Sequence, residues 1–437
     1  MLTKPPSGTR DFLPDDIRRR EYVVGVVRGV YERYGFEPLE TPAFENIDTL
    51  LGKYGDEGNK LIFKILRRGE HEASGDADLA LRYDLTVPLA RVVAQYQNEL
   101  PKFFKRYQIQ PVWRADRPAR GRFREFYQCD IDSIGSTSPV VEVEQLSAVS
   151  DVLTGLGFRD FKIQLNHREL LSAMLEAAEV PAARHGEALV AIDKLDKIGR
   201  DGVHQELVGR GIGAKSAEAC LAALDNVPAF EKLVAGNDRG AAATSHIGRI
   251  IALSADTPAA AHVSFVPRLA RGLSYYTGAI MEITVPDMAG SLGGGGRYDN
   301  LVGMFLGRDV PACGFSLGLE RVIVVMTERN MFPESVAGGA VDVMVSLWNE
   351  EARGDALALA GALRSGGLKV DVYPEADKLG KQFKYASSRD VPFVTIVGDD
   401  ERTNGTVSVK DLRSGGQETV PRAEAAAYIT ARVNREP

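Results

Sequence analysis

Basic side chains are concentrated in one short segment of this 437-residue chain. Residues 102–124 contain eight lysines and arginines and a single acidic residue, Asp116, in a protein with a net charge of −7. Guanidinium groups bind phosphate oxygens in pairs, and a local positive excess on an acidic protein attracts anions to that place. The segment therefore predicts a site for a phosphate-bearing ligand, although a solvated surface loop has the same composition.

Residues 102–132 have the pattern of a β-hairpin. Two strand-like stretches, 102–113 and 122–132, flank a charged loop at 115–121 that contains Pro118 and Gly121. Because side chains alternate along a strand, one face of the second strand is expected to be polar apart from one aromatic ring. That face would carry Arg122, Arg124, Phe126, Gln128, Asp130 and Asp132. It could clamp phosphates, stack on a base and receive an ammonium or imidazole group, or it could face solvent.

A second segment combines small residues with the start of a helix. Gly314, Ser316 and Gly318 precede Glu320 and Arg321. Small residues on a strand leave a surface on which a planar ring can lie, and a helix N-terminus favours anions. Close packing of a helix on a strand also requires small residues, so this motif alone leaves both interpretations open.

Four consecutive glycines, 293–296, lie between the two segments and precede Arg297, Tyr298 and Asp299. They form no dinucleotide-binding fingerprint, because no glycine follows three places after a G-x-G pair, and the chain contains no G-K-[ST] of a P-loop. We therefore expect arginine side chains and Mg²⁺ to hold phosphates here. The glycines themselves predict either a flexible turn or a close approach of the backbone to a ligand.

Hydrophobic periodicity indicates the elements that must position these segments. Helices are expected at 17–34, 86–96 and 319–326, and strands at 36–42, 79–84 and 280–285. Residues 167–262 are alanine-rich with helical spacing and carry none of the motifs, which predicts a helical insertion. After a linker at 333–339, strands at 341–347, 369–372 and 393–397 and a helix at 356–363 predict a separate α/β domain.

Composition sets the broad class. The length exceeds the ~250–300 residues at which single cores stop growing, so two or three domains are expected. No apolar run approaches the ~18–20 residues that span a bilayer, and the N-terminal residues lack a targeting pattern. The three cysteines are widely separated and form no zinc pair or disulfide framework, which favours the cytoplasm. The negative net charge argues against a protein that coats nucleic acid with its whole surface.

Together these motifs resemble a class II aminoacyl-tRNA synthetase, and specifically the histidyl-tRNA synthetase family. The three class motifs are similar to the helix and strand that end at Pro42, to residues 113–132 and to residues 318–321. Two histidine-specific signatures are similar to LRYDLT at 81–86 and RGLSYYT at 271–277. The resemblance implies an α/β (α+β) fold with an antiparallel-sheet catalytic core at 1–166 and 263–332, a helical insertion at 167–262, and an α/β anticodon-binding domain at 340–437.

The resemblance also implies residue roles. Arg114 and Arg271 would be catalytic, with Arg114 on the ATP α-phosphate and Arg271 on the α-phosphate and the histidine carboxylate. Other ATP-binding residues would be Arg122 on the β- and γ-phosphates, with Phe126 and Arg321 on either side of adenine. The histidine ammonium would be held by Asp84, Thr86 and Gln128, and the imidazole would be read by Asp132 and Tyr276, with Tyr275 beside them. Arg117 and Arg120 would bind the acceptor end of the tRNA.

The implied reaction is the ATP-dependent joining of histidine to its tRNA by a homodimer, with Mg²⁺ as the metal cofactor. Many members have aspartate where Ser274 stands, and glutamate is common at the positions of Asp116 and Asp132. An aspartate reaches about one methylene less, so the imidazole is expected to lie deeper or to be met through water. The main alternative is a histidine-binding regulatory paralogue that does not charge tRNA. Lone histidines such as His71, His167 and His262 are expected to be structural.

Overall fold

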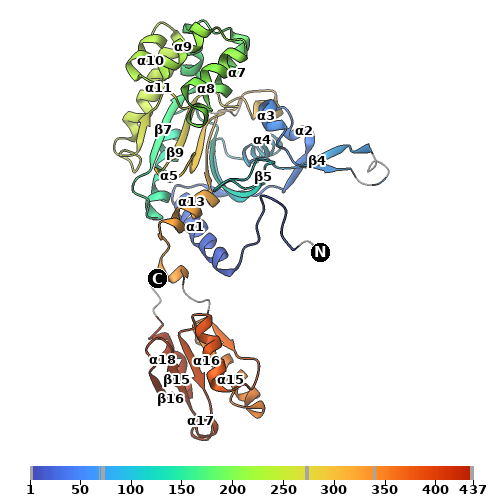
Figure 1. The fold of residues 1–437 in the computed structure, drawn as a ribbon, viewed down its shortest axis with the longest axis vertical. Helices are drawn as coiled ribbons and strands as arrows, with labels where there is room; N and C mark the ends of the chain where they lie inside the picture. Colours follow the sequence, from blue (N-terminus) through green and yellow to red (C-terminus); the bar gives the residue numbers. More distant parts are fainter. Residues whose placement is uncertain (1–2, 68, 70–73, 271–274, 338–340, 434–437) are drawn as a thin grey trace. The chain divides into compact units, whose positions relative to one another are not determined.

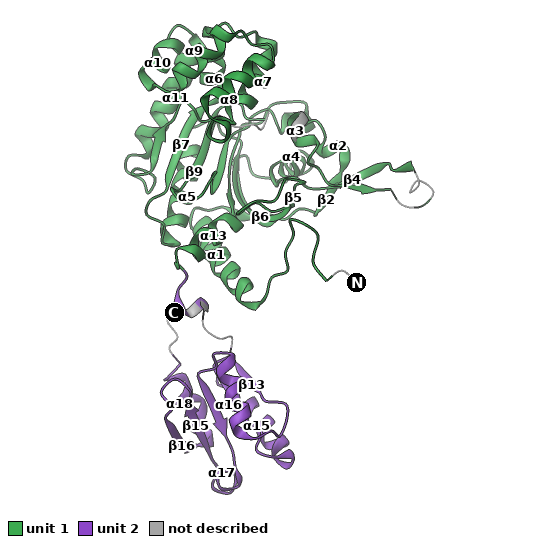
Figure 2. Ribbon diagram, viewed as in Figure 1, with its two compact units in different colours: residues 1–331 green, residues 332–437 purple. Residues whose placement is uncertain are grey.

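The computed structural model describes residues 3–67, 69, 74–270, 275–337 and 341–433. The chain forms two compact units, residues 1–331 and residues 332–437, which are coloured separately in Figure 2. Figure 1 traces the chain through both units. The candidate site residues all belong to the first unit.

The first unit is built on an eight-stranded sheet with the order β1-β5-β6-β11-β10-β9-β7-β8. Every neighbouring pair is antiparallel except β1–β5 and β7–β8, which are parallel. The strands are β1 (Glu37–Pro38), β5 (Phe104–Trp113), β6 (Glu125–Ile134), β7 (Lys162–His167), β8 (Val263–Phe265), β9 (Ala279–Thr284), β10 (Gly293–Arg297) and β11 (Ala312–Gly318). The two segments singled out in the sequence thus become neighbouring central strands, β6 and β11.

Three helices pack together beside this sheet: α1 (Pro14–Arg33), α5 (Val140–Gly155) and α13 (Leu319–Glu328). Helix α1 buries Val23, Val27 and Val30, the stripe expected from helical spacing. Helix α13 begins directly after β11, with Gly318 as its N-cap residue. The end of the small-residue strand therefore leads straight into Glu320 and Arg321.

A small three-stranded sheet, β2-β4-β3, lies beside the large one. Its strands are β2 (Phe44–Asn46), β3 (Lys64–Leu66) and β4 (Ala77–Leu81). It is accompanied by the helices α2 (Ile47–Leu50), α3 (Gly55–Asn59), α4 (Thr86–Gln95) and α12 (Gly303–Leu306). The LRYDLT segment connects β4 to α4, so its polar residues lie in a short turn between a strand and a helix.

The residues between β7 and β8 are helical, as their periodicity predicted. The helices are α6 (Arg168–Ala177), α7 (His185–Ile192), α8 (Leu195–Gly209), α9 (Ala214–Leu224), α10 (Val227–Val234) and α11 (Asp238–Ser254), with a short 3₁₀ helix at Ala182–Arg184. Helix α11 contacts α5, β7 and β8, and Phe230 of α10 lies beside Phe265 of β8, so this group of helices is packed on the core sheet mainly through its last two helices.

The second unit has a five-stranded sheet with the order β13-β12-β14-β15-β16. Its strands are β12 (Val343–Val345), β13 (Val370–Val372), β14 (Phe393–Ile396), β15 (Thr406–Asp411) and β16 (Gln417–Pro421). Its helices are α14 (Glu334–Ala337), α15 (Arg353–Ser365), α16 (Leu379–Ser388), α17 (Asp399–Asn404) and α18 (Ala425–Thr430), with 3₁₀ turns at Glu350–Ala352 and Arg422–Glu424. The three parallel strands and the helix α15 confirm the expected α/β pattern.

The structure corrects three expectations. Strand β6 begins at Glu125 rather than at Arg122, because Arg122 and Ala119 exchange backbone hydrogen bonds in a tight turn. The segment at 36–42 contributes only the two-residue strand β1. The four glycines form strand β10 rather than a turn. Side chains at Gly293 and Gly295 would meet carbonyl oxygens of β11, so glycine lets the backbones of β10 and β11 approach closely.

Candidate active site

The carboxylate of Asp84 is held in the turn before α4. Its Oδ1 accepts hydrogen bonds from the Tyr54 hydroxyl at 3.0 Å and from the Val87 N–H at 3.0 Å, and the Tyr275 hydroxyl lies 3.4 Å from its Oδ2. Burial raises the pKa of Asp84, which the Val87 N–H and then the charge of Arg114 oppose. Since Oδ1 already has two donors, Oδ2 is the oxygen that can receive a cationic ligand group.

Thr86 and Tyr275 belong to the same pocket. Thr86 is the first residue of α4, and its side chain is hydrogen-bonded to the Tyr275 hydroxyl. The ring centroid of Tyr275 lies 4.9 Å from that of Tyr276 and 6.0 Å from that of Tyr298. Gly296 lies against the ring of Tyr276, where a Cβ atom would be only 2.8 Å from Cδ1. The tyrosines of the RGLSYYT signature are therefore buried next to Asp84, and we call the group of residues around them the pocket.

Three arginines converge on one region. The Arg114 Nε donates to the Tyr83 carbonyl at 3.0 Å, and its guanidinium lies 5.2 Å from the centroid of the Phe126 ring. Arg321 donates to the Ser291 carbonyl. Burial lowers the pKa of Arg321, and so do the positive charges of Arg122 and Arg114.

Arg122 and Arg114 therefore lie close enough to Arg321 for their charges to act on it, and several positive charges are gathered in this part of the site. Of the neighbours that act on Arg321, Glu282 and Asp116 carry the opposite charge. Asp116 also lies 3.9 Å from the Arg122 guanidinium. A polyanion would be attracted to this place, as the concentration of arginines predicted.

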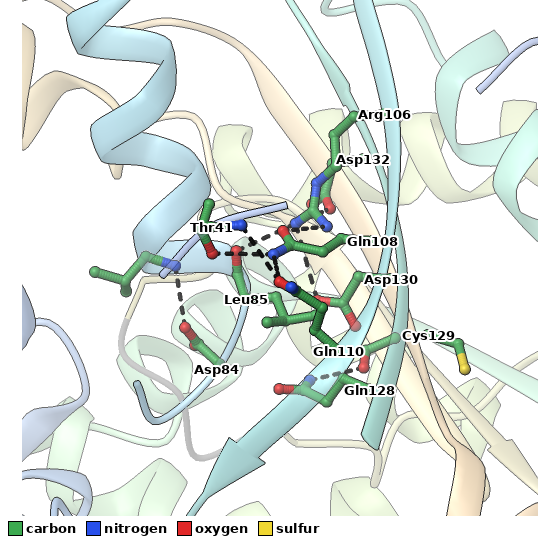
Figure 3. Close-up of polar contacts among 12 residues, drawn as sticks. Thr41, Asp84, Leu85, Arg106, Gln108, Gln110, Gln128, Cys129, Asp130 and Asp132 are labelled. Carbon is green, nitrogen blue, oxygen red and sulfur yellow. Dashed lines mark hydrogen bonds and ion pairs between the residues drawn. The ribbon is translucent and has the colours of Figure 1, made fainter. Parts of the chain in front are cut away.

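Asp132 is connected to the tyrosines of the RGLSYYT signature through Tyr298 and is 2% exposed. Its Oδ1 accepts a hydrogen bond from Tyr298, and its Oδ2 lies 2.7 Å from the Arg106 guanidinium in an ion pair. Arg106 is fully buried and also donates to the Leu85 carbonyl and to Gln108. Figure 3 shows Arg106 reaching across from β5 to the carboxylates of β6.

Gly314 makes room for this carboxylate. It is the partner of Asp132 in the β6–β11 pairing, and a Cβ atom at Gly314 would overlap Asp132 Oδ1. Two residues further along the same face of β11, the Ser316 hydroxyl accepts a hydrogen bond of 2.7 Å from the Gln128 side-chain amide. The expectation of an open surface for a planar ring on this strand is therefore wrong at both positions, because Asp132 and Gln128 occupy the space.

Asp130 adds a second buried carboxylate, 3.9 Å from Arg106. Burial raises the pKa of both Asp130 and Asp132, and Arg106 opposes the rise. Among the residues that the structure describes, Asp130 Oδ1 and Gln128 Oε1 have no hydrogen-bond partner. The polar face of β6 is therefore buried from Gln128 to Asp132 and does not face solvent.

The predicted residues fall into four groups. One group converges on the pocket: Asp84, Thr86, Arg114, Arg122, Phe126, Gln128, Asp132, Tyr275, Tyr276 and Arg321. Arg124 does not join it, because its guanidinium donates to the Asp116 carbonyl and its stem packs against Gly8. Arg117 is exposed on the preceding loop, and Arg120 pairs with Glu328 on α13. Arg271 and Ser274 lie outside the described residues.

Sequence reasoning missed three residues of this site. Arg106 and Tyr298 hold Asp132, and Tyr54 holds Asp84. Of these three, only Arg106 could have been anticipated from the sequence. Arg106, Gln108 and Gln110 alternate along β5, opposite the polar residues of β6. The partners of Tyr54 and Tyr298 lie far away in the sequence, and no local pattern indicates them.

Two of the histidines set aside as structural do have structural partners. The Nδ1 of His167 accepts the Glu169 N–H and caps α6, and the ring of His262 stacks on Phe161 with 3.7 Å between centroids. His71 lies outside the described residues. In the part of the chain that the structure describes, no group of three or more His, Cys, Asp or Glu is arranged to hold a metal ion. No helix in that part is both long and apolar enough to cross a bilayer.

Comparison with known protein families shows to which family the chain belongs. A family model described as histidyl-tRNA synthetase matches residues 8–322, and one described as an anticodon binding domain matches residues 341–432. The chain belongs to the histidyl-tRNA synthetase family. This confirms the resemblance and the fold class predicted from the motifs.

Relatives agree over the whole length. The histidine–tRNA ligase of Porphyromonas gingivalis is 41% identical over 456 residues, covering 98% of this chain and 100% of the relative. That of Flavobacterium johnsoniae is 39% identical over 468 residues, covering 96% and 98%. The crystal structure of histidyl-tRNA synthetase from Nostoc sp. PCC 7120 matches 99% of this chain and 100% of its own, with a TM-score of 0.80 and 30% identity.

A fourth match concerns the fold alone. A crystal structure from Bacillus halodurans, titled an ATP phosphoribosyltransferase regulatory subunit/histidyl-tRNA synthetase, has a TM-score of 0.72 at 21% identity over 88% of this chain. The fold of this family therefore does not by itself separate a tRNA-charging enzyme from a regulatory paralogue.

Proposed function

We infer that this chain is a histidine–tRNA ligase. It activates histidine with ATP, forming histidyl-adenylate and pyrophosphate, and then transfers histidine to the 3′ end of its cognate tRNA. The observation that carries this conclusion is the placement of Arg114 against Tyr83 and Phe126 and of Arg321 against Gly121, next to Arg122. These arginines lie in the same part of the fold as the buried carboxylates of Asp84 and Asp132. The full-length relatives named histidine–tRNA ligase support the same conclusion.

The pocket suits the two ends of histidine. We propose that Asp84 Oδ2, Thr86 and Gln128 hold the α-ammonium group, and that Asp132, Tyr275 and Tyr276 contact the imidazole. Arg106 and Tyr298 engage both oxygens of Asp132, so the carboxylate is fixed in one orientation before histidine arrives. The wrong side chain would leave these buried polar groups unpaired, which can discriminate by ~10⁴–10⁵ without editing.

Adenylation needs no general base. The histidine carboxylate is ionised at neutral pH and attacks the α-phosphorus of ATP, and pyrophosphate leaves. Catalysis is then positioning plus stabilisation of negative charge on the phosphoryl oxygens. We propose this role for Arg114 and Arg271, with Arg122 on the β- and γ-phosphates. Adenine would lie between Phe126 and Arg321.

For a Mg²⁺ ion at the triphosphate, the residues near the arginines offer one suitable carboxylate. Such an ion usually keeps several waters and binds the substrate phosphates together with one or two carboxylates. Glu282 on β9 lies within electrostatic reach of Arg321 and is the carboxylate we propose for it. Glu320 is unsuited, because its Oε2 accepts the Tyr127 N–H and its Oε1 faces Arg10 and Arg20. When bound, the ion would supply additional positive charge at the triphosphate.

The remaining assignments are proposals from the family resemblance. The tRNA acceptor end would be held by Arg117 and Arg120, and the anticodon by residues 340–437. The catalytic core would comprise 1–166 and 263–332, with the helical insertion at 167–262. We further propose a homodimer that works in the cytoplasm.

The regulatory paralogue remains the second candidate, because the match from Bacillus halodurans has the same fold. Two features favour the ligase: Arg321 is present in the site, and an anticodon-binding domain follows it. The deciding experiment measures ATP–pyrophosphate exchange with each of the twenty amino acids, followed by charging of tRNA. Exchange that depends on histidine alone, with charging of histidine tRNA, is expected. Histidine binding without exchange would favour the paralogue.

A further inference from the structure

The N-terminal segment forms a column of alternating aromatic rings and guanidinium groups. The Arg10 guanidinium lies 3.5 Å from the centroid of the Phe123 ring and 4.7 Å from that of Phe12. The Arg20 guanidinium, from α1, lies 3.7 Å from Phe12 and 4.6 Å from the Tyr127 ring. Cations over ring faces are attracted by the ring quadrupole, so each guanidinium is held between two rings.

A buried carboxylate lies beside this column. Glu320, in the first turn of α13, is 4% exposed, and its Oε1 is 3.8 Å from both Arg10 and Arg20. Its other oxygen, Oε2, accepts the Tyr127 N–H at 2.9 Å. Burial raises the pKa of Glu320, whereas the Tyr127 N–H and the two arginines favour its ionised form. One carboxylate thus ties together the N-terminal segment, α1, β6 and α13.

A second attachment lies a few residues away. The Arg124 N–H donates to the Gly8 carbonyl at 2.7 Å, and the Arg124 side chain packs so closely that a Cβ at Gly8 would be 2.7 Å from its Cγ. Gly8 has φ of +85°, a conformation that glycine adopts without strain. The N-terminal segment therefore contacts the chain at Phe123, Arg124 and Tyr127.

The ATP-site residues are covalent neighbours of these contacts. Arg122 precedes Phe123, Phe126 precedes Tyr127, and Arg321 follows Glu320. Side chains alternate along β6, so Tyr127 can face the column while Phe126 faces the pocket. We propose that Arg10 and Arg20 are positioning residues for ATP, which fix Arg122, Phe126 and Arg321 through the column and Glu320. This inference rests on the proposed function, because it concerns the nucleotide of that reaction.

The test separates positioning from a merely structural role. Arg10→Met removes the charge but keeps an unbranched stem, and Arg10→Lys keeps a cation between the rings. We expect Arg10→Met to raise the KM for ATP in histidine-dependent pyrophosphate exchange roughly tenfold, with the KM for histidine unchanged within about twofold. Arg10→Lys should restore most of the ATP affinity. Arg18→Ala is the matched control, because Arg18 lies on α1 and pairs with exposed Asp15.

Two results would overturn the inference. One is a lower melting temperature in Arg10→Met with both KM values unchanged, which would make the column structural only. The other is an equal rise of both KM values. If Arg10→Met does not fold, Arg20→Lys and Phe12→Leu test the same column with smaller changes. Calorimetric titration with ATP measures the effect on binding even if wild-type protein shows no histidine-dependent exchange, so failure of the proposed function remains distinguishable.

Discussion

Asp132 illustrates how a buried charge is prepared for a ligand. Its carboxylate has Tyr298 on one oxygen and Arg106 on the other, and the space it occupies exists because residue 314 is glycine. Removing one partner from a buried, paired charge generally costs about 3–5 kcal/mol, because the other charge is left uncompensated. Losing one partner of this network should therefore destabilise the fold and also disturb the site that we propose for the histidine side chain.

Gly314→Ala should damage histidine binding selectively. The added methyl group would overlap Asp132 Oδ1 and lie 3.2 Å from the Tyr298 ring, and the paired backbones of β6 and β11 restrict any relief. We expect the KM for histidine in pyrophosphate exchange to rise at least tenfold and the stability to fall by about 1–3 kcal/mol. Gly318→Ala is the control on the same strand, since its nearest contact would be the Leu292 carbonyl at 3.3 Å. Equal effects of the two substitutions on the KM for histidine would contradict this account.

Arg271→Ala should separate binding from chemistry. We expect it to keep much of the histidine binding and to lower adenylation by a few orders of magnitude, because a guanidinium that stabilises developing phosphoryl charge acts mainly in the transition state. Single-turnover adenylate formation and equilibrium histidine binding measure the two effects. Unchanged histidine-dependent pyrophosphate exchange in this variant would refute the role proposed for Arg271.

At the scale of elements, sequence patterns predicted what local spacing determines. The buried stripe of α1, the start of α13 and the pair β5–β6 follow from periodicity and turn residues. The glycine run was misjudged because its conformation depends on strands β9 and β11, which lie on either side of it. The early start assigned to the second hairpin strand failed because Arg122 exchanges backbone hydrogen bonds with Ala119 in a tight turn, which the turn residues Pro118 and Gly121 did not locate closely enough.

The same contrast between local patterns and long-range contacts applies to the site residues. Residues that lie in motifs, such as Arg114 and Asp84, were named from the sequence, whereas Tyr298 was not, because its contact with Asp132 spans 166 residues. The buried state of the polar face of β6 was also left open by alternation. It required knowledge of β11, since Gly314 and Ser316 pair with Asp132 and Asp130 across the two strands and Ser316 accepts the Gln128 amide.

His167, the N-cap residue of α6, should make the free energy of unfolding depend on pH. Burial lowers the pKa of His167 to about 3, with further contributions from His246 and Arg297. The unfolded chain binds a proton near pH 6.5, so between these values it holds more protons than the folded one, and stability falls as the pH drops. From pH 7 to 5.5 this histidine alone should cost about 1 kcal/mol.

His167→Asn tests this directly. Asparagine can cap the helix without titrating, so the variant should lose less free energy of unfolding than the wild type between pH 7 and 5.5. The difference between the two proteins cancels other groups, including His246 and Arg297, which act on His167, Glu142, which lies 3.9 Å from His246, and the carboxylates of β6. Urea unfolding at both pH values measures this loss. If the wild type and His167→Asn lose the same free energy of unfolding between pH 7 and 5.5, His167 is not the titrating group.

At the scale of the whole molecule, the two units divide the proposed work. The first contains the pocket, and the second matches an anticodon-binding domain. A macromolecular polyanion releases counterions when it binds, whereas histidine is small and carries little net charge. The two substrates should therefore respond differently to salt.

We expect the KM for tRNA to rise at least tenfold between 50 and 200 mM salt, while the KM for histidine in pyrophosphate exchange changes by less than threefold. Steady-state charging and exchange assays at both ionic strengths make the comparison. An equal response of the two KM values would argue against tRNA binding through exposed arginines such as Arg117.

Strands β7 and β8 are parallel neighbours, with Ile163 beside Val263. Helices α6 to α11 are therefore, in topological terms, one long crossover connection, which needs only about a dozen residues to be feasible. The connection leaves β7 after His167 and enters β8 at Val263, which pairs with Ile163 near the other end of β7. Helices α7 to α9 lie between these two points in the chain, so they can be lengthened, trimmed or exchanged without shifting the register of the catalytic strands. Helices α10 and α11 have to be retained in any graft, because α11 packs on β7 and β8 and the Phe230 ring of α10 lies 5.9 Å from the Phe265 ring of β8.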